Sequence, residues 1–586
     1  MHTSRFAPRF VRSTLIALAA ILLLVTPALA YFAPSNGQAA TLVLGQPNFT
    51  SSAYATTQTG MHDPYAVAVD PLTQKVFVAE YDNNRVLRFA SVSALSNGAP
   101  AEDVLGQTDF TSNAANATRS GMHNPTSVFV DAGGRLWVAD AYNNRILRFD
   151  HAATLPNGAN ASAVLGQPNF TSHASQVTRT GLSGPTSVFV DPSGRLWEVE
   201  EYNNRVLRFD HAATLPNGAK ADGVLGQPNF TSKGTATTRN GMYYPYGLVV
   251  DSSGRLWVGD YWNNRVLRFD NAASKVDGAN ADGVLGQPNF TSSVYATTQT
   301  GMYGPASLAV DNASGRLFVA EYENNRILVF NSAAGLANGA AASTVLGQPG
   351  FTTGTINTGG LSATSLCQPL GIYFDPASQV LWVPDTGNNR VLIYGQPNRY
   401  FSATSSAAQD GWVLESAAHS EVGGSFSTAG TLRVGYDASN RQYRSILSFN
   451  TSALPDDAVI QSVTLKILKA GTTGTDPIKL SGEIGPFTAD IQDGYFGTSP
   501  ALEAVDFQAL ASQGAVGDFS SIGKGWYSLV LPSYAYSDVN LTGLTQFRLH
   551  FMAPSNNNNK AEYDTFFAGD ASAADRPVLT IEYTLP

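Results

Sequence analysis

The chain has 586 residues, a formal net charge of −10 at pH 7, and only 14% charged residues. This length exceeds what one hydrophobic core usually holds, so we expect at least two domains. The negative charge argues against a nucleic-acid partner, which needs a basic face, and the single cysteine, Cys367, excludes an internal disulfide.

Residues 1–30 predict a secretory signal peptide. A region with three arginines precedes an apolar stretch at residues 15–25, and Ala28-Leu29-Ala30 fits a cleavage site. The apolar stretch is shorter than the roughly 20 residues that a spanning helix needs, which favours cleavage over an uncleaved anchor. We therefore expect a secreted protein or one at the extracellular cell surface, with no membrane span after signal cleavage.

A six-fold repeat dominates residues 31–395. The tripeptide Asn-Asn-Arg occurs six times, at spacings of 60, 60, 60, 61 and 64 residues. A fixed period indicates one repeated supersecondary unit, in which no copy can bury its apolar faces alone. The first asparagines of the copies are Asn83, Asn143, Asn203, Asn263, Asn324 and Asn388.

Each repeat contains four short apolar runs. In the second copy they cover residues 127–130, 136–139, 146–149 and 163–165. Helices need longer runs, so these are predicted strands. The runs are apolar on both faces, as expected for a sheet between two neighbouring sheets. Four short strands per unit, repeated around an axis, predict an all-β fold that begins with a six-bladed β-propeller.

The sixth copy lacks its fourth strand. Val-Leu-Gly-Gln follows each of the first five copies, but the pattern stops at Gly395-Gln396. The same sequence occurs near the other end of the propeller, at Val43-Leu44-Gly45-Gln46. We therefore expect this N-terminal strand to complete the sixth blade and to leave no unpaired edge.

The repeated sequence Asp-x-x-Asn-Asn-Arg-Ile-Leu-Arg-Phe, preceded by Gly-Arg-Leu-Trp-Val, resembles the NHL repeat. That family forms six-bladed propellers, and the resemblance covers about residues 41–395. The acid varies between Asp and Glu. The third copy departs further, because Glu198 stands where the other copies have an apolar residue.

A different pattern begins after the repeats. Residues 396–409 predict a linker, and residues 410–586 contain at least seven strand-like segments with long loops, which predict a jelly-roll-like β-sandwich. Its sequence words, such as Tyr-Arg-Ser-Ile-Leu-Ser-Phe and Arg-Pro-Val-Leu-Thr, resemble DNRLRE-type modules of secreted bacterial proteins. Some relatives of that kind are classed as carbohydrate-binding modules. The segments are 412–414, 431–434, 445–449, 463–467, 526–530, 547–551 and 578–583.

Arg441 and Tyr443 are candidate ligand contacts in the second domain. A planar donor and an aromatic face both suit a hydroxyl-rich ligand such as a polysaccharide. The alternative is structural, with Tyr443 in the packing and Arg444 in an ion pair.

Within the propeller, residues that repeat six times predict structural roles, whereas binding should lie where the copies differ. The acid and the arginine, five residues apart across a turn, are expected to pair. The Trp or Phe slot of the second strand is expected to pack between blades. The same turns also carry aromatic residues, which predict a ligand-binding rim. The rim residues are Tyr81, Tyr142, Tyr202, Tyr261, Trp262 and Tyr322.

Two histidines suggest another role for this face. His62 and His123 occupy the same slot in consecutive copies, and Asp63 or His173 could add a ligand for a divalent metal. The resemblance also implies this alternative, because some six-bladed relatives are lyases that hold a metal by histidines in the channel.

The favoured interpretation is a secreted, non-catalytic recognition or scaffold protein. We expect a monomer that binds an extracellular polysaccharide or a cell-surface protein. One alternative is an extracellular lyase that uses the propeller channel and a histidine-bound metal. The other is a structural cell-surface protein.

Overall fold

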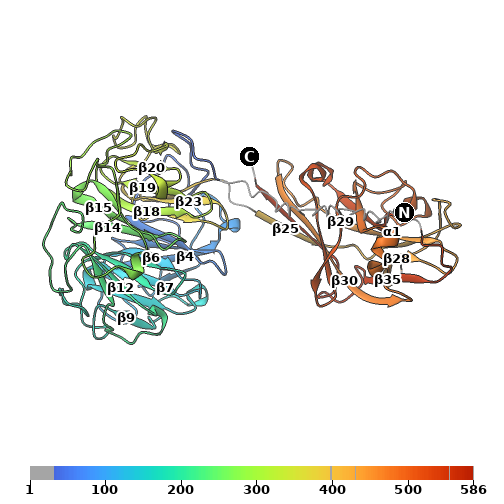
Figure 1. The fold of residues 1–586 in the computed structure, drawn as a ribbon, viewed down its shortest axis with the longest axis horizontal. Coiled ribbons are helices and arrows are strands. Elements are labelled where there is room, and N and C mark those ends of the chain that lie inside the picture. Colours follow the sequence, from blue (N-terminus) through green and yellow to red (C-terminus); the bar gives the residue numbers. More distant parts are fainter. Residues whose placement is uncertain (1–31, 396–398, 429, 554, 585–586) are drawn as a thin grey trace, which may run out of the picture.

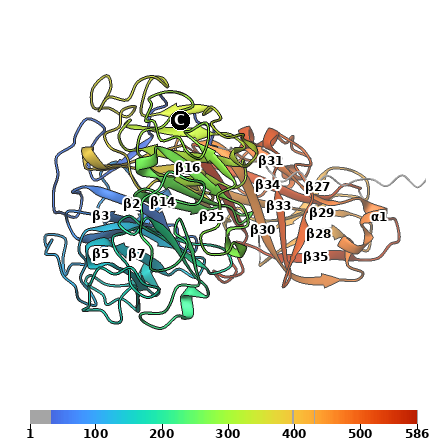
Figure 2. The same ribbon diagram turned by 60° about the vertical axis from the view of Figure 1, so that its left-hand side comes forward.

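The computed structural model describes residues 32–395, 399–428, 430–553 and 555–584. The predicted signal peptide, residues 1–30, lies outside the described residues. Two all-β bodies lie side by side in both views (Figure 1 and Figure 2). Within the described ranges, every helix is too short or too polar to cross a membrane.

Residues 32–395 form six blades, each an antiparallel sheet of four strands (Figure 1). The inner strands of neighbouring blades contact one another around the ring, including those of the first and sixth blades. The first five blades follow chain order from the inner to the outer strand. They are blade 1, β2 (Pro64–Val69), β3 (Lys75–Glu80), β4 (Arg85–Ser91) and β5 (Asp103–Leu105); blade 2, β6 (Pro125–Val130), β7 (Leu136–Asp140), β8 (Arg145–Phe149) and β9 (Ala163–Leu165); blade 3, β10 (Pro185–Val190), β11 (Leu196–Glu200), β12 (Arg205–Phe209) and β13 (Gly223–Leu225); blade 4, β14 (Pro245–Val250), β15 (Leu256–Asp260), β16 (Arg265–Phe269) and β17 (Gly283–Leu285); and blade 5, β18 (Pro305–Asp311), β19 (Arg316–Glu321), β20 (Arg326–Phe330) and β21 (Thr344–Leu346).

The sixth blade combines the two ends of the propeller sequence. It contains β22 (Tyr373–Asp375), β23 (Val380–Asp385) and β24 (Arg390–Tyr394), and its outer strand is β1 (Leu42–Leu44). In the register between β1 and β24, Val43 lies opposite Leu392. The predicted closure of the ring by the N-terminal strand is therefore confirmed.

The Asn-Asn-Arg turn connects the second and third strands of every blade. In blade 2, Arg145 Nε donates to Asp140 Oδ2 at 2.7 Å, and both side chains are fully buried. Asn143 donates its amide to the same carboxylate at 2.9 Å. The predicted structural role of the acid and the arginine is confirmed, because all six pairs are buried in the same way: Glu80–Arg85, Asp140–Arg145, Glu200–Arg205, Asp260–Arg265, Glu321–Arg326 and Asp385–Arg390.

The second asparagine of the turn joins neighbouring blades. Asn144 has a left-handed backbone, with φ of 50°, and its Oδ1 accepts a hydrogen bond from the Gly184 amide of blade 3 at 3.0 Å. Asparagine tolerates this conformation better than most residues. Six such bonds run around the ring, and the last joins blade 6 to blade 1. Their acceptors are Asn84, Asn144, Asn204, Asn264, Asn325 and Asn389.

The aromatic slot of each second strand also packs between blades, as predicted. Each ring is buried in a hydrophobic cluster with residues of the following blade. The six residues are Phe77, Trp137, Trp197, Trp257, Phe318 and Trp382.

The C-terminal domain has two groups of antiparallel strands that share one long strand, β30 (Val459–Thr473). The larger of its hydrophobic clusters collects side chains from both groups, which is consistent with a β-sandwich. Its jelly-roll topology stays a prediction. The first group adds β25 (Arg399–Thr404), β32 (Ser520–Gly523), β33 (Trp526–Val530) and β36 (Val578–Thr584); the second adds β26 (Gly411–Glu415), β27 (Gly423–Ser427), β28 (Thr431–Tyr436), β29 (Gln442–Asn450), β31 (Phe487–Asp493), β34 (Leu544–Phe551) and β35 (Glu562–Phe567).

One segment differs from its predicted state. Residues 396–409 were expected to be a linker, but Arg399–Thr404 form β25, which pairs along its whole length with β36. The strand pairs only with β36, so it lies at an edge of the sheet, and its side chains alternate between half-buried and exposed. The polar residues of this segment make the strand hard to recognise in the sequence.

Candidate functional site

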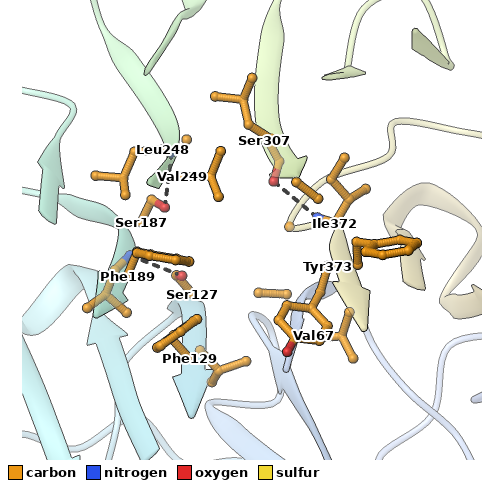
Figure 3. A pocket seen from close by; sticks show the side chains of 18 of the residues that line it. Val67, Ser127, Phe129, Ser187, Phe189, Leu248, Val249, Ser307, Ile372 and Tyr373 are labelled. Carbon is orange, nitrogen blue, oxygen red and sulfur yellow. Dashed lines mark hydrogen bonds between the residues drawn. The ribbon is translucent and has the colours of Figure 1, made fainter. Parts of the chain in front are cut away.

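The inner strands surround a channel cavity of about 190 Å³ (Figure 3). Serines on these strands connect neighbouring blades. The Ser127, Ser187 and Ser307 hydroxyl groups accept hydrogen bonds from the amides of the next blade, at 3.2, 3.3 and 3.1 Å. Dashed lines in Figure 3 mark these bonds. These serines therefore have a structural role, because they connect neighbouring blades.

The described lining of this channel cavity lacks an acid or base that titrates near neutral pH. Of the described residues that line it, none is Asp, Glu, His, Lys, Arg or Cys. Its titratable side chains are Tyr246 and Tyr373, and burial raises the pKa of both hydroxyl groups well above the ordinary value. General acid–base catalysis needs a group that titrates near the working pH.

The turns at one end of the channel present two side chains each, between the acid and Asn-Asn-Arg. Side chains at the first position are buried or half-buried. The Tyr81 ring stacks on Tyr65 of an inner strand at 4.2 Å, and the Tyr261 ring meets Tyr246 in a tilted contact at 6.1 Å. Side chains at the second position are mostly exposed. In blade order, the first position holds Tyr81, Ala141, Glu201, Tyr261, Tyr322 and Thr386, and the second holds Asp82, Tyr142, Tyr202, Trp262, Glu323 and Gly387.

The predicted aromatic rim therefore divides into two groups. Tyr142, Tyr202 and Trp262 are 52%, 47% and 49% exposed. The remaining three, Tyr81, Tyr261 and Tyr322, are half-buried. Tyr261 also uses its hydroxyl group in a hydrogen bond to Glu323 at 2.8 Å. The rings of the first group are available to a ligand without loss of core packing.

Three predicted rim residues line one cavity of about 250 Å³ between blades 2 and 3. Tyr81, Tyr142 and Tyr202 supply rings, and the inner-strand residue Tyr246 supplies another. The predicted contacts Tyr261, Trp262 and Tyr322 lie outside this cavity. We call this space the blade 2–3 pocket.

Glu201 also lines the blade 2–3 pocket, and the sequence analysis missed it. Its carboxylate has no hydrogen-bond or ion-pair partner among the described residues. Burial raises the pKa of this carboxyl group to about 7. The signal in the sequence was the replacement of the tyrosine that three other blades carry at this turn position.

The structure does not bring the two predicted metal-binding histidines into one group. His62 Nε2 lies 3.3 Å from Asp82, and with Asp63 these residues form the one potential metal-binding group in the described ranges. His123 instead packs against Tyr142, with ring centroids 5.1 Å apart. Each histidine is anchored through its backbone amide to the acid of its own blade, which keeps the two apart.

The prediction that Tyr443 contacts a ligand is wrong, because this residue is only 6% exposed. It lies on the central strand β29, between Trp412 and Tyr563, each with a ring centroid 5.2 Å away. Arg441 is half-exposed, but its guanidinium group is bound to Asp437 at 2.6 Å. The sequence analysis missed Arg433, which lies over all three of these rings.

Comparisons with known proteins concern mainly the propeller. The family described as NHL repeat matches residues 122–149, 242–269 and 302–330, in blades 2, 4 and 5. No curated protein matches the chain.

Several solved structures are similar. A streptogramin B lyase is 14% identical over 59% of this chain and 95% of its own, with a TM-score of 0.34. An auxiliary nutrient binding protein from Bacteroides thetaiotaomicron is 11% identical over 60% of this chain and 76% of its own, with a TM-score of 0.38. A virginiamycin B lyase from Staphylococcus aureus is 15% identical over 57% of this chain and 95% of its own, with a TM-score of 0.32. The family matches and the closed ring of sheets identify residues 32–395 as a six-bladed β-propeller that contains NHL repeats.

Proposed function

We propose that this is a secreted recognition protein without catalytic activity, which binds an extracellular polysaccharide through its aromatic rim. The observation that carries the proposal is the blade 2–3 pocket, where Tyr142 and Tyr202 are half exposed beside a cavity on a rigid scaffold. Exposed rings of this kind suit stacking on the C–H faces of sugars. The turn backbone is already held by the acid and Asn-Asn-Arg, so the rings are free to bind.

The C-terminal domain supports the same proposal in a second way. Arg433 and Trp412 are half-buried on its surface, with the guanidinium carbon 4.8 Å from the ring centroid. An arginine and an aromatic ring together suit a carbohydrate-binding module. We propose this surface, in place of Tyr443, as the domain's carbohydrate contact.

The double variant Tyr142→Ala/Tyr202→Ala should bind polysaccharide about tenfold more weakly or worse, because two aromatic contacts of ~1 kcal/mol or more are lost. Its melting temperature should stay close to that of the parent, since both rings are half exposed. Affinity electrophoresis against a polysaccharide panel, with thermal melting in parallel, measures both quantities. The control is Tyr534→Ala, which removes a 60% exposed ring from the other domain. Equal retardation of the parent and the double variant would remove the rim from the proposal.

The lyase alternative depends on the group formed by His62, Asp63 and Asp82. One imidazole and two carboxylates are ligand types that divalent metals accept. If this alternative holds, elemental analysis of purified protein should find about one divalent ion per chain. His62→Ala should strip the ion, whereas His123→Ala should retain it. Metal-free parent protein, prepared without chelators, would contradict the lyase alternative.

A further inference from the structure

We propose that the blade 2–3 pocket binds an organic ammonium group, carried either as a quaternary ammonium head or as a protonated amine. The proposal deepens the proposed function and rests on it, since it names the chemical group that the rim recognises. The pocket volume of about 250 Å³ suits a small head group and not a drug-sized molecule.

The walls of the pocket are aromatic on several sides. Tyr81 and Tyr142 meet edge to face, with ring centroids 6.1 Å apart, and Tyr202 lies across the cavity mouth from blade 3. A cation near ring faces is attracted by the ring quadrupole, and aromatic cages for alkylated ammonium groups use this arrangement. A neutral sugar would stack on the same rings but would gain far less from their quadrupoles than a full positive charge does.

Glu201 supplies the negative charge when its carboxyl group, with a pKa raised to about 7 by burial, is ionised. No arginine or lysine lines the described pocket, so the structure leaves this carboxylate without a counter-ion. Burial alone accounts for the raised pKa of Glu201, which agrees with the absence of a nearby cation. A half-buried carboxylate without a partner still carries a desolvation cost, and a bound ammonium group would offset that cost.

A single small residue makes room for the pocket. Ala141 occupies the turn position where blades 1, 4 and 5 carry Tyr81, Tyr261 and Tyr322. On the opposite wall, Gly184 has φ of 60°, and a Cβ atom there would meet the Tyr202 ring at 2.6 Å. Glycine recurs at this position in blade 5, as Gly304, so Ala141 is the replacement that distinguishes this pocket.

The charges around the pocket match the proposal. Other carboxylates near this end of the channel include Asp63, Asp82 and Glu323. Burial raises the pKa of the Tyr65 hydroxyl group most, and the charges of Asp63, Asp82 and Glu201 raise it further. These charges make the face electronegative, which favours an approaching cation. An anionic ligand would meet repulsion from the same groups.

The test is isothermal titration calorimetry of the full-length chain with choline, with ethanolamine, and with 3,3-dimethyl-1-butanol, the neutral carbon analogue of choline. Choline or ethanolamine should bind at least tenfold more tightly than the neutral analogue. Whichever of the two binds more tightly identifies the quaternary or the protonated amine as the preferred group. Equal binding of the neutral analogue, or no binding of either ammonium compound, would overturn the inference.

Two variants test where the ammonium group binds. Glu201→Gln keeps the shape of the side chain and should weaken ammonium binding at least tenfold. Ala141→Tyr should abolish it, because the introduced ring fills the cavity, and the fold should tolerate a residue that three other blades carry there. Glu483→Gln, an exposed carboxylate of the C-terminal domain, is the control for net charge and should bind like the parent. Thermal melting verifies that each variant is folded. Parent-like binding by Ala141→Tyr would contradict the location.

The outcomes separate this inference from the proposed function. Polysaccharide retained without ammonium binding would overturn the inference and leave the rim as a neutral glycan site. Ammonium binding that Ala141→Tyr abolishes, with no polysaccharide retained, would support the pocket and contradict the polysaccharide as its ligand.

Discussion

Removal of residues 32–48 should unfold the propeller or reduce it to an aggregating species, because the sixth blade then loses its outer strand. Leu42, Val43 and Leu44 are 5%, 0% and 0% exposed in the closed ring. Burial of a Leu or Val side chain is worth about 1.5–3 kcal/mol, so three of them contribute about as much as the whole stability of many domains. The deletion also exposes the edge of β24, which invites pairing with another chain.

Thermal melting and size-exclusion chromatography of the deletion variant measure this effect. A matched control keeps β1 but replaces Thr50 and Ser51, which lie just after it on the surface, with alanine. The control should melt like the parent. If the deletion variant also melts like the parent, the pairing of β1 with β24 does not hold the ring closed.

Glu198→Val should stabilise the protein by roughly 3 kcal/mol at pH 7. Glu198 is fully buried in β11, and neither of its carboxylate oxygens has a hydrogen-bond partner among the described residues. The equivalent residues of blades 2 and 4 are Val138 and Val258, so the replacement fits the strand. Buried, unpaired carboxyl groups cost several kcal/mol, and apolar replacements of buried charges commonly stabilise by 1–4 kcal/mol.

The gain should depend on pH in a defined direction. Burial, aided by the nearby Glu200 charge, raises the pKa of Glu198 well above the ordinary 4.5. Above pH 4.5 the unfolded chain releases this proton, whereas the native protein retains it until the raised pKa is reached. The parent therefore loses stability as pH rises through this window, by up to about 1.4 kcal/mol per pH unit.

Urea unfolding of the parent and of Glu198→Val at pH 4, 5.5 and 7 tests this dependence. The advantage of the variant should be smallest at pH 4 and largest at pH 7. Glu198→Gln serves as the control, since it removes the titratable group but keeps a buried polar group, and should gain less. A Glu198→Val protein less stable than the parent at pH 7 would mean that the carboxyl group has a stabilising partner.

The repeat made the propeller predictable, whereas the site depended on contacts between copies. Six copies of one pattern indicate the strands, the turn and the closure, because each copy must bury its apolar faces against its neighbours. Glu201 and the small residue Ala141 come from neighbouring blades and line the same pocket. No single copy of the repeat contains that information.

The C-terminal domain was harder to predict for two different reasons. Strands β27 and β32 are exposed and poor in apolar residues, so no periodic pattern marks them. Tyr443 was misassigned because β29 is a central strand with buried residues on both faces, Leu447 in one cluster and Ile446 in another. An alternating sequence correctly predicts an exposed face only for a strand that has one face in solvent.

The pairing of β1 with β24 also sets the order in which the ring can form. Thr41 and Ile393 are hydrogen-bonded although 352 positions separate them in the chain. Five blades can assemble from adjacent strands, but β1 must wait until β24 has been synthesised. During that interval the N-terminal segment exposes apolar side chains, and the nascent chain is most vulnerable to misassembly. The ring is therefore completed late in synthesis. Its closure stabilises only chains that have been translated beyond the sixth repeat.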